Sequence, residues 1–191
     1  MRRKSIWLGL GILVVLSIVL LFTNFHLATS ETQTNVTTAS SRRPSGASLS
    51  SQTVPYKVEG NGSLAEALRE ALPQKLMNAQ LAADTAVPQL IVRLDQTDIH
   101  WTPVYGRAEI VATAAFSSNG DFAFMETKPT YFQLNNGEGD STNSVVQAAS
   151  EISLTDKSTG LFSRPGYYQL VASKLAEEIN KALQSNIFTA P

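Results

Sequence analysis

The sequence predicts an α+β fold, a two-layer sandwich of a four-stranded, mainly antiparallel sheet and two helices. Two segments place apolar residues at helical spacing, one of them at the end of the chain. Between them, four runs alternate apolar and polar residues, as do strands with one covered face. Ahead of this pattern, about 55 residues have the composition of an apolar helix and a linker. We therefore expect one domain at residues 55–187 and a short tail at 188–191.

Composition narrows the function classes. The chain has 191 residues, 15 basic and 16 acidic side chains, and a formal net charge of −1. This balance argues against a nucleic-acid partner, which requires clustered Lys and Arg. The absence of cysteine excludes disulfides, thiolate metal sites and a cysteine nucleophile.

The N-terminus combines basic and apolar residues. Basic side chains fill positions 2–4, and residues 6–22 are uninterrupted by charge. With its flanks, the run reaches roughly 30 Å as a helix, the thickness of a bilayer core. We expect a membrane anchor at residues 5–25, with residues 1–4 in the cytoplasm and the domain outside. This means a single-pass protein of the cytoplasmic membrane. The alternative is secretion after signal-peptide cleavage near Ser30, because residues 28–30 have the small-x-small form of a cleavage site.

Residues 26–54 are rich in Ser and Thr and contain few large apolar side chains. Such a composition buries too little surface to offset the entropy of ordering. We therefore expect a disordered linker.

The domain begins with a short possible strand at residues 54–58, followed by a predicted helix and four further strands. Ser63 and Glu66 have the spacing of a capping box, and Pro73 predicts a kink or a second short helix. A change of parity near residues 96–98 predicts a β-bulge. Asn119 and Gly120 predict a hairpin turn. The strands are expected at residues 89–101, 104–116, 122–127 and 146–154.

The closing helix has the clearest boundaries. Ser163 is expected to cap it, with Pro165 in its first turn. Its apolar stripe faces the sheet, whereas its charged residues are expected on the outer faces. The stripe comprises Tyr168, Val171, Ala172, Leu175, Ile179, Ala182 and Leu183; the charged residues are Lys174, Glu177, Glu178 and Lys181.

The sequence offers little catalytic chemistry. His26 lies outside the expected domain, which leaves His100 beside Asp98. Two ligands do not make a specific zinc site, which requires three or four. Serine residues lack a neighbouring base, and no phosphate-binding fingerprint is present. We therefore expect no catalytic residue, no metal and no cofactor, and a protein that is not an enzyme.

The sheet face away from the helices is more apolar than solvation requires. We expect a binding face there or at the nearby sheet edge. An alternative is that a second helix or the 134–143 loop covers this face. The candidate residues are Trp101, Tyr105, Val111, Thr113, Met125 and Tyr131.

The order of elements resembles small bacterial envelope proteins, namely the lipopolysaccharide-assembly lipoprotein and the auxiliary lipoproteins of ABC transporters. The resembling stretch is residues 63–185, with LAEALREAL, PQLIVRLDQTDIHW, PVYGRAEIVATAAFSSNGD and YYQLVASKLAEEINKAL. Those families use a lipidated cysteine, which a membrane helix would replace here. The resemblance implies an interaction or scaffold module of a cell-envelope assembly or transport system, with a protein partner. The alternative is a binding domain for a lipid or another apolar ligand.

Overall fold

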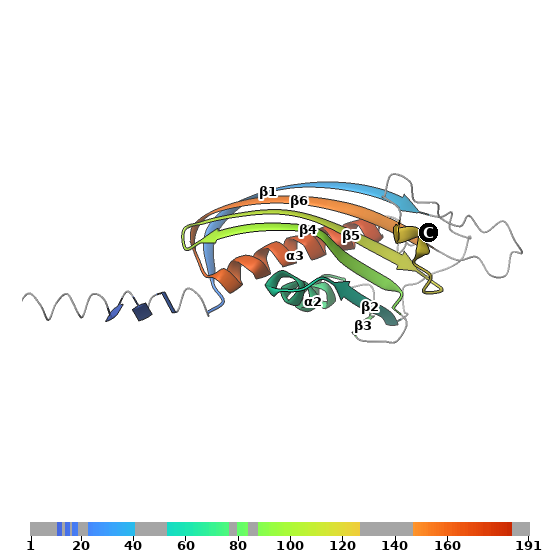
Figure 1. Cartoon of the computed structure of the whole chain (residues 1–191), viewed down its shortest axis with the longest axis horizontal. Coiled ribbons are helices and arrows are strands. Elements are labelled where there is room, and N and C mark those ends of the chain that lie inside the picture. The colour runs from blue at the N-terminus through green and yellow to red at the C-terminus, as the bar shows by residue number, and fades with distance from the viewer. Residues whose placement is uncertain are drawn as a thin grey trace, which may run out of the picture.

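A computed structural model shows an arched sheet with two helices packed beneath it (Figure 1). The structure describes residues 11–12, 14–15, 17–18, 23–40, 53–76, 80–83, 88–126 and 147–184. The strands are β1 (His26–Ser40), β2 (Thr53–Glu59), β3 (Gln80–Ala83), β4 (Leu90–Thr102), β5 (Tyr105–Ser117) and β6 (Gln147–Phe162). The helices are α2 (Ser63–Lys75), α3 (Arg164–Leu183) and the 3₁₀ turn η1 (Ala123–Glu126).

The sheet has six strands in the order β1-β6-β5-β4-β2-β3. The strands β1, β6, β5 and β4 are antiparallel, whereas β2 pairs parallel with both β4 and β3. The prediction of a four-stranded, mainly antiparallel sheet was therefore wrong. The possible strand at residues 54–58 is confirmed as β2. Strands β1 and β3 were missed, because β3 is short and β1 lacks the apolar alternation from which strands are recognised.

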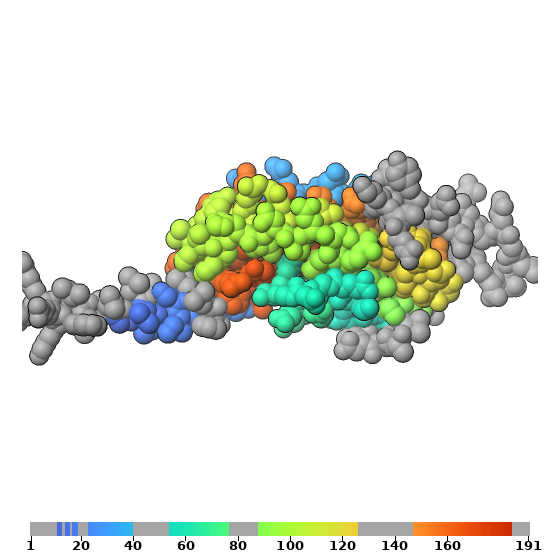
Figure 2. Space-filling view, viewed as in Figure 1, coloured from blue at the N-terminus to red at the C-terminus, as the bar shows by residue number. Residues whose placement is uncertain are grey.

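Helices α2 and α3 pack on each other and cover one face of the sheet. In Figure 2 the turquoise surface of α2 and the orange-red surface of α3 lie beneath the yellow-green surface of β4 and β5. The side chains that β5 contributes to the main core all have the even parity expected from the sequence. They meet the apolar stripe of α3, so one core fills the space between the layers. The β5 contributors are Ala108, Ile110, Ala112, Ala114 and Phe116.

Strand β1 occupies residues 26–40, where the sequence predicted a disordered linker. It pairs with β6 along all of its 15 residues without a register shift. The chain also approaches α3 closely: a Cβ placed on Gly166 would lie 2.1 Å from the carbonyl oxygen of Phe25. The linker prediction was therefore wrong for this stretch.

The N-terminal anchor is also contradicted. Within the described parts of the chain, no helix combines the length and apolar character needed to cross a membrane. The predicted span at residues 5–25, and with it the single-pass membrane location, is not supported. Cleavage near Ser30 fits no better, because Ser30 lies inside β1 and its hydroxyl contacts the core.

Local predictions had mixed outcomes. A bulge is confirmed, but it lies just before the predicted residues 96–98, since the β4–β5 register shifts between Leu94 and Gln96. Ser163 caps α3 and accepts a hydrogen bond from the Gly166 N–H at 3.0 Å. The capping box of α2 was wrong, because Gly62 is the N-cap and provides no side-chain bond. The strand expected at residues 122–127 was wrong too, since η1 forms there.

Helix α2 continues through Pro73 and ends at Lys75, so no second helix begins at the proline. Proline has no N–H, so the carbonyl of Arg69, four residues earlier, loses its helical donor. The Tyr56 hydroxyl on β2 donates to this carbonyl at 3.1 Å. A strand side chain thereby replaces the missing helix bond and ties α2 to the sheet.

Candidate functional site

The predicted binding residues do not form one surface. Tyr105 is 37% exposed, and Val111 is half-buried on the helix-free face of β5. Thr113 and Met125 are buried, with 2% and 5% exposure. Trp101 is half-buried and packs against the main core on the helix side. Tyr131 lies outside the described residues, as does the 134–143 loop.

The helix-free face is partly covered at one end by η1. Met125 and Phe124 pack there with Ile91, Ala115 and Ala149 in a small second cluster. Towards the middle of the face, Thr113 donates to the Asp95 carboxylate at 2.6 Å. The apolar character that the sequence showed is therefore largely used for packing at this end of the sheet.

The opposite end of the sheet carries exposed apolar side chains. Leu27, Val104, Tyr105 and Leu161 are 73%, 62%, 37% and 45% exposed, and we call this group the apolar end. Leu27 is the register partner of Leu161 on the neighbouring strand. The β4–β5 turn joins them, because the Gly160 N–H donates to the Val104 carbonyl at 3.2 Å. Three segments distant in sequence thus build one contiguous patch.

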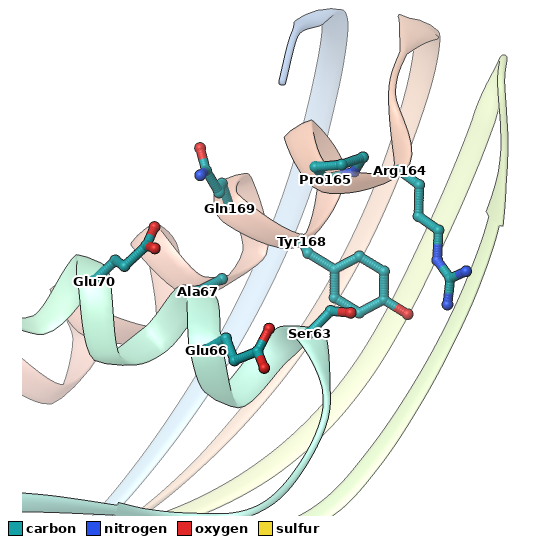
Figure 3. A pocket seen from close by; sticks show the side chains of 8 residues that line it. All are labelled: Ser63, Glu66, Ala67, Glu70, Arg164, Pro165, Tyr168 and Gln169. Atoms are coloured by element: carbon teal, nitrogen blue, oxygen red, sulfur yellow. The ribbon is translucent and has the colours of Figure 1, made fainter. Parts of the chain in front are cut away.

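A shallow groove of about 350 Å³ lies between the N-terminal halves of α2 and α3. Figure 3 shows Glu66 and Glu70 on the α2 side and Tyr168 with Arg164 on the α3 side. The Arg164 guanidinium lies 5.7 Å from the centre of the Tyr168 ring, at cation–π distance. The remaining lining residues are Ser63, Ala67, Pro165 and Gln169. The groove is open and of mixed charge, with no enclosed reaction centre.

A polar cluster lies beneath β1 and was not predicted from the sequence. The Asp156 carboxylate on β6 is fully buried and pairs with the Lys174 ammonium of α3 at 2.9 Å. Two β1 hydroxyls complete the contact: Thr32 donates to Asp156 at 2.8 Å, and Ser30 donates to the same oxygen. The other carboxylate oxygen accepts from Ser158 at 2.9 Å and Tyr167 at 3.1 Å.

The cluster shifts the ionisation of its members. Burial alone would raise the pKa of Asp156, but the hydrogen bonds from Ser30, Lys174, Thr32 and Ser158 outweigh it and hold the pKa below its ordinary value. Burial and the nearby Asp156 charge raise the pKa of the Tyr167 phenol. Asp156 is therefore a carboxylate and Tyr167 a neutral donor at neutral pH.

His26 lies at the edge of this cluster, stacked on Phe162 with 5.4 Å between the ring centres. Its Nε2 is buried and has no hydrogen-bond partner within the described residues. Burial lowers the pKa of His26, Asp156 opposes this effect, and Lys174 adds to it. The ring is consequently neutral at neutral pH.

The polar cluster resembles a catalytic arrangement in composition, but its contacts are those of a buried ion pair with hydroxyl donors. Lys174 is bound to a buried carboxylate, so its ammonium is the cation of an ion pair and not a free base. The Ser30 hydroxyl donates a hydrogen bond to that carboxylate. These contacts attach β1 to β6 and α3.

His100 and Asp98 are exposed on the helix-free face of β4. No cluster of three or more His, Asp or Glu side chains arranged for a metal ion occurs in the described part of the chain.

The polar cluster around Asp156 does leave a signal in the sequence. Short polar residues alternate at positions 30 and 32 on one strand and at 156 and 158 on the other.

Comparison with known proteins gives little further guidance. No family model and no curated protein matches the chain. Among solved structures, a point variant of the PelC dodecamer from Paraburkholderia phytofirmans has 10% identity and a TM-score of 0.35, covering 78% of this chain and 98% of that chain. PelC in another crystal form has 10% identity and a TM-score of 0.31, with the same coverage. At these TM-scores the likeness supports no argument about the fold or function of this chain.

Proposed function

We propose that the domain is a non-catalytic interaction module that binds a protein partner through its apolar end. The observation that supports this proposal is the gathering of Leu27, Val104, Tyr105 and Leu161, all exposed, where three segments of the sheet meet. Outside the N-terminal segment, Val36 is the other large apolar side chain exposed in the described residues. Exposed apolar side chains are thus concentrated here and not scattered.

The composition of this end is that of an interface. Contiguous apolar patches on soluble domains mark contact sites, and tyrosine is enriched in such contacts. The next outward residues of β5 are charged: Arg107 and Glu109 pair with each other and are 51% and 40% exposed. An apolar centre with a charged margin is the usual arrangement of core and rim. A cell-envelope assembly or transport system as the setting of this partner stays a prediction.

The experiment compares lysine substitutions in the full-length, tagged chain. Leu161→Lys and Leu27→Lys place a charge in the apolar end, and Ser153→Lys places the same charge at an exposed position of β6 outside it. Partners captured from the source cells are then quantified by mass spectrometry. We expect a loss of at least tenfold for the first two variants and none for Ser153→Lys. Equal recovery with all three folded variants would disprove the proposal.

The same preparations test the alternative of an apolar ligand. Organic extraction of the purified chain, followed by mass spectrometry, detects a lipid held in stoichiometric amounts. A lipid that Leu161→Lys releases, without any change in captured proteins, would favour the ligand-binding alternative over the protein-interaction module.

A further inference from the structure

Strand β1 forms one edge of the sheet, with β6 on one side. No strand pairs with its other side within the described residues. The Phe25 carbonyl accepts from the Ser163 N–H at 3.0 Å, so the odd-numbered residues direct their backbone groups towards β6. Because strands alternate, the even-numbered residues from His26 onwards direct their N–H and C=O groups outward. Within the described residues, no strand pairs with this row of outward donors and acceptors.

This edge lacks the usual protection against pairing. Natural edge strands carry lysine, proline or a bulge, or are kept very short. The 15 residues of β1 contain no proline and no basic side chain except His26, and Glu31 is their one acidic residue. Its register with β6 is unbroken from end to end. Five threonines add β-propensity, namely Thr29, Thr32, Thr34, Thr37 and Thr38.

The sequence of β1 is complementary to itself when two copies run antiparallel. Full overlap of residues 26–40 places Gln33 opposite Gln33 of a second copy. It also places Glu31 opposite Asn35 and Thr29 opposite Thr37, and on the other face Thr32 opposite Thr34. No like charges then face each other, and threonine pairs stabilise antiparallel sheets. A register centred on Glu31 would instead oppose the two carboxylates.

We propose that two copies of this chain pair through β1 and form one continuous sheet across a two-fold axis at Gln33. Such an interface is isologous, the commonest form of homodimer. The axis stands perpendicular to the sheet, so the helices of both copies lie on the same side. The polar cluster supports the edge from beneath, because Ser30 and Thr32 hold β1 against Asp156. This inference does not rest on the apolar end.

Cysteine cross-linking tests the register, since the chain has no cysteine of its own. Odd-numbered residues form the non-hydrogen-bonded pairs of the new interface, with Cα atoms about 4.5 Å apart. Gln33→Cys in the full-length chain should therefore form a disulfide dimer under mild oxidation with copper phenanthroline. Asn35→Cys, equally exposed on the same face, is the matched control, because its two copies would lie about 14 Å apart, beyond disulfide reach.

Mixing the two variants Glu31→Cys and Asn35→Cys should give a cross-linked dimer that neither forms alone.

A second test adds substitutions at Thr34 to the Gln33→Cys chain. Thr34→Pro removes an outward N–H without touching the β6 ladder and should abolish the cross-link. Thr34→Val keeps this N–H and should preserve the cross-link. Circular dichroism checks that each variant is folded. Equal cross-linking at positions 33 and 35, or none at 33, would overturn the proposal.

Discussion

Asp156 and Lys174 form an ion pair of 2.9 Å that joins β6 to α3. The carboxylate is fully buried, whereas the Lys174 side chain keeps 25% exposure. Hydroxyls from β1 bond to the same carboxylate oxygen, so one buried charge connects three elements. A carboxylate in such a place is costly unless every oxygen is bonded, which predicts that its partners are individually important.

Lys174→Met should lower the free energy of unfolding by about 3–5 kcal/mol, because it leaves Asp156 buried without its cation. Lys181→Met is the matched control on the same helix. Lys181 is 59% exposed and pairs with Glu177 and Glu178 at the surface, where such pairs contribute about 1 kcal/mol or less. Urea denaturation followed by circular dichroism measures both. Equal losses for the two variants would show that the buried pair has no special weight.

Stability should fall with acid. The pKa of Asp156 is lower in the folded chain than in the unfolded chain, so its contribution is present above the unfolded value of about 3.9 and is lost as pH falls through the folded value. His26 acts in the same direction at higher pH, because its folded pKa is also lowered from 6.5. Below that value the unfolded chain binds the proton more readily.

Urea titrations between pH 3 and pH 8 separate these two groups. His26→Phe should flatten the pH dependence just below 6.5 and leave the acid limb unchanged. Asp156→Asn should lower stability at neutral pH and reduce the acid limb. A profile in which His26→Phe changes nothing would contradict the neutral state assigned to this half-buried ring.

Tyr56→Phe should destabilise the domain by about 1 kcal/mol, the net worth of one hydrogen bond. The lost bond is the one to the Arg69 carbonyl, which Pro73 leaves without a helical donor. The double variant Tyr56→Phe/Pro73→Ala tests this cause, since alanine restores an N–H at position 73. The penalty of Tyr56→Phe should shrink in the Pro73→Ala background. An unchanged penalty would mean that the two residues act independently.

The sequence predicted α3 and β5 well because their buried positions are apolar and regular. It missed β1 and the second half of β6, where the residue at a fully buried position is Asp156 and its neighbours are Ser and Thr. Alternating Ser, Thr and Asp residues have the same composition as a linker. Only the fold shows that Lys174 of α3 faces them and pairs with Asp156. The stripe on α3 was also displaced by one residue at its start, since Tyr167 is buried and Tyr168 only partly so. Whether these residues are buried depends on contacts with residues that are distant in the sequence.

The helix-free face can be tested with two lysine substitutions, Met125→Lys and Val111→Lys. Met125 is 5% exposed and packs in the second cluster with Ile91 and Ala115, so a lysine there would bury an unpaired charge. Val111 is half-buried on the same face but outside that cluster, and lysine can extend its ammonium to water. Thermal melting should show a large loss for Met125→Lys, about 2 kcal/mol or more, and less than about 1 kcal/mol for Val111→Lys. If both variants unfold, the middle of this face is core as well, and it leaves no surface for a partner there. If both stay as stable as the parent, η1 does not close the end of the sheet, and the face is open from Met125 to Val111.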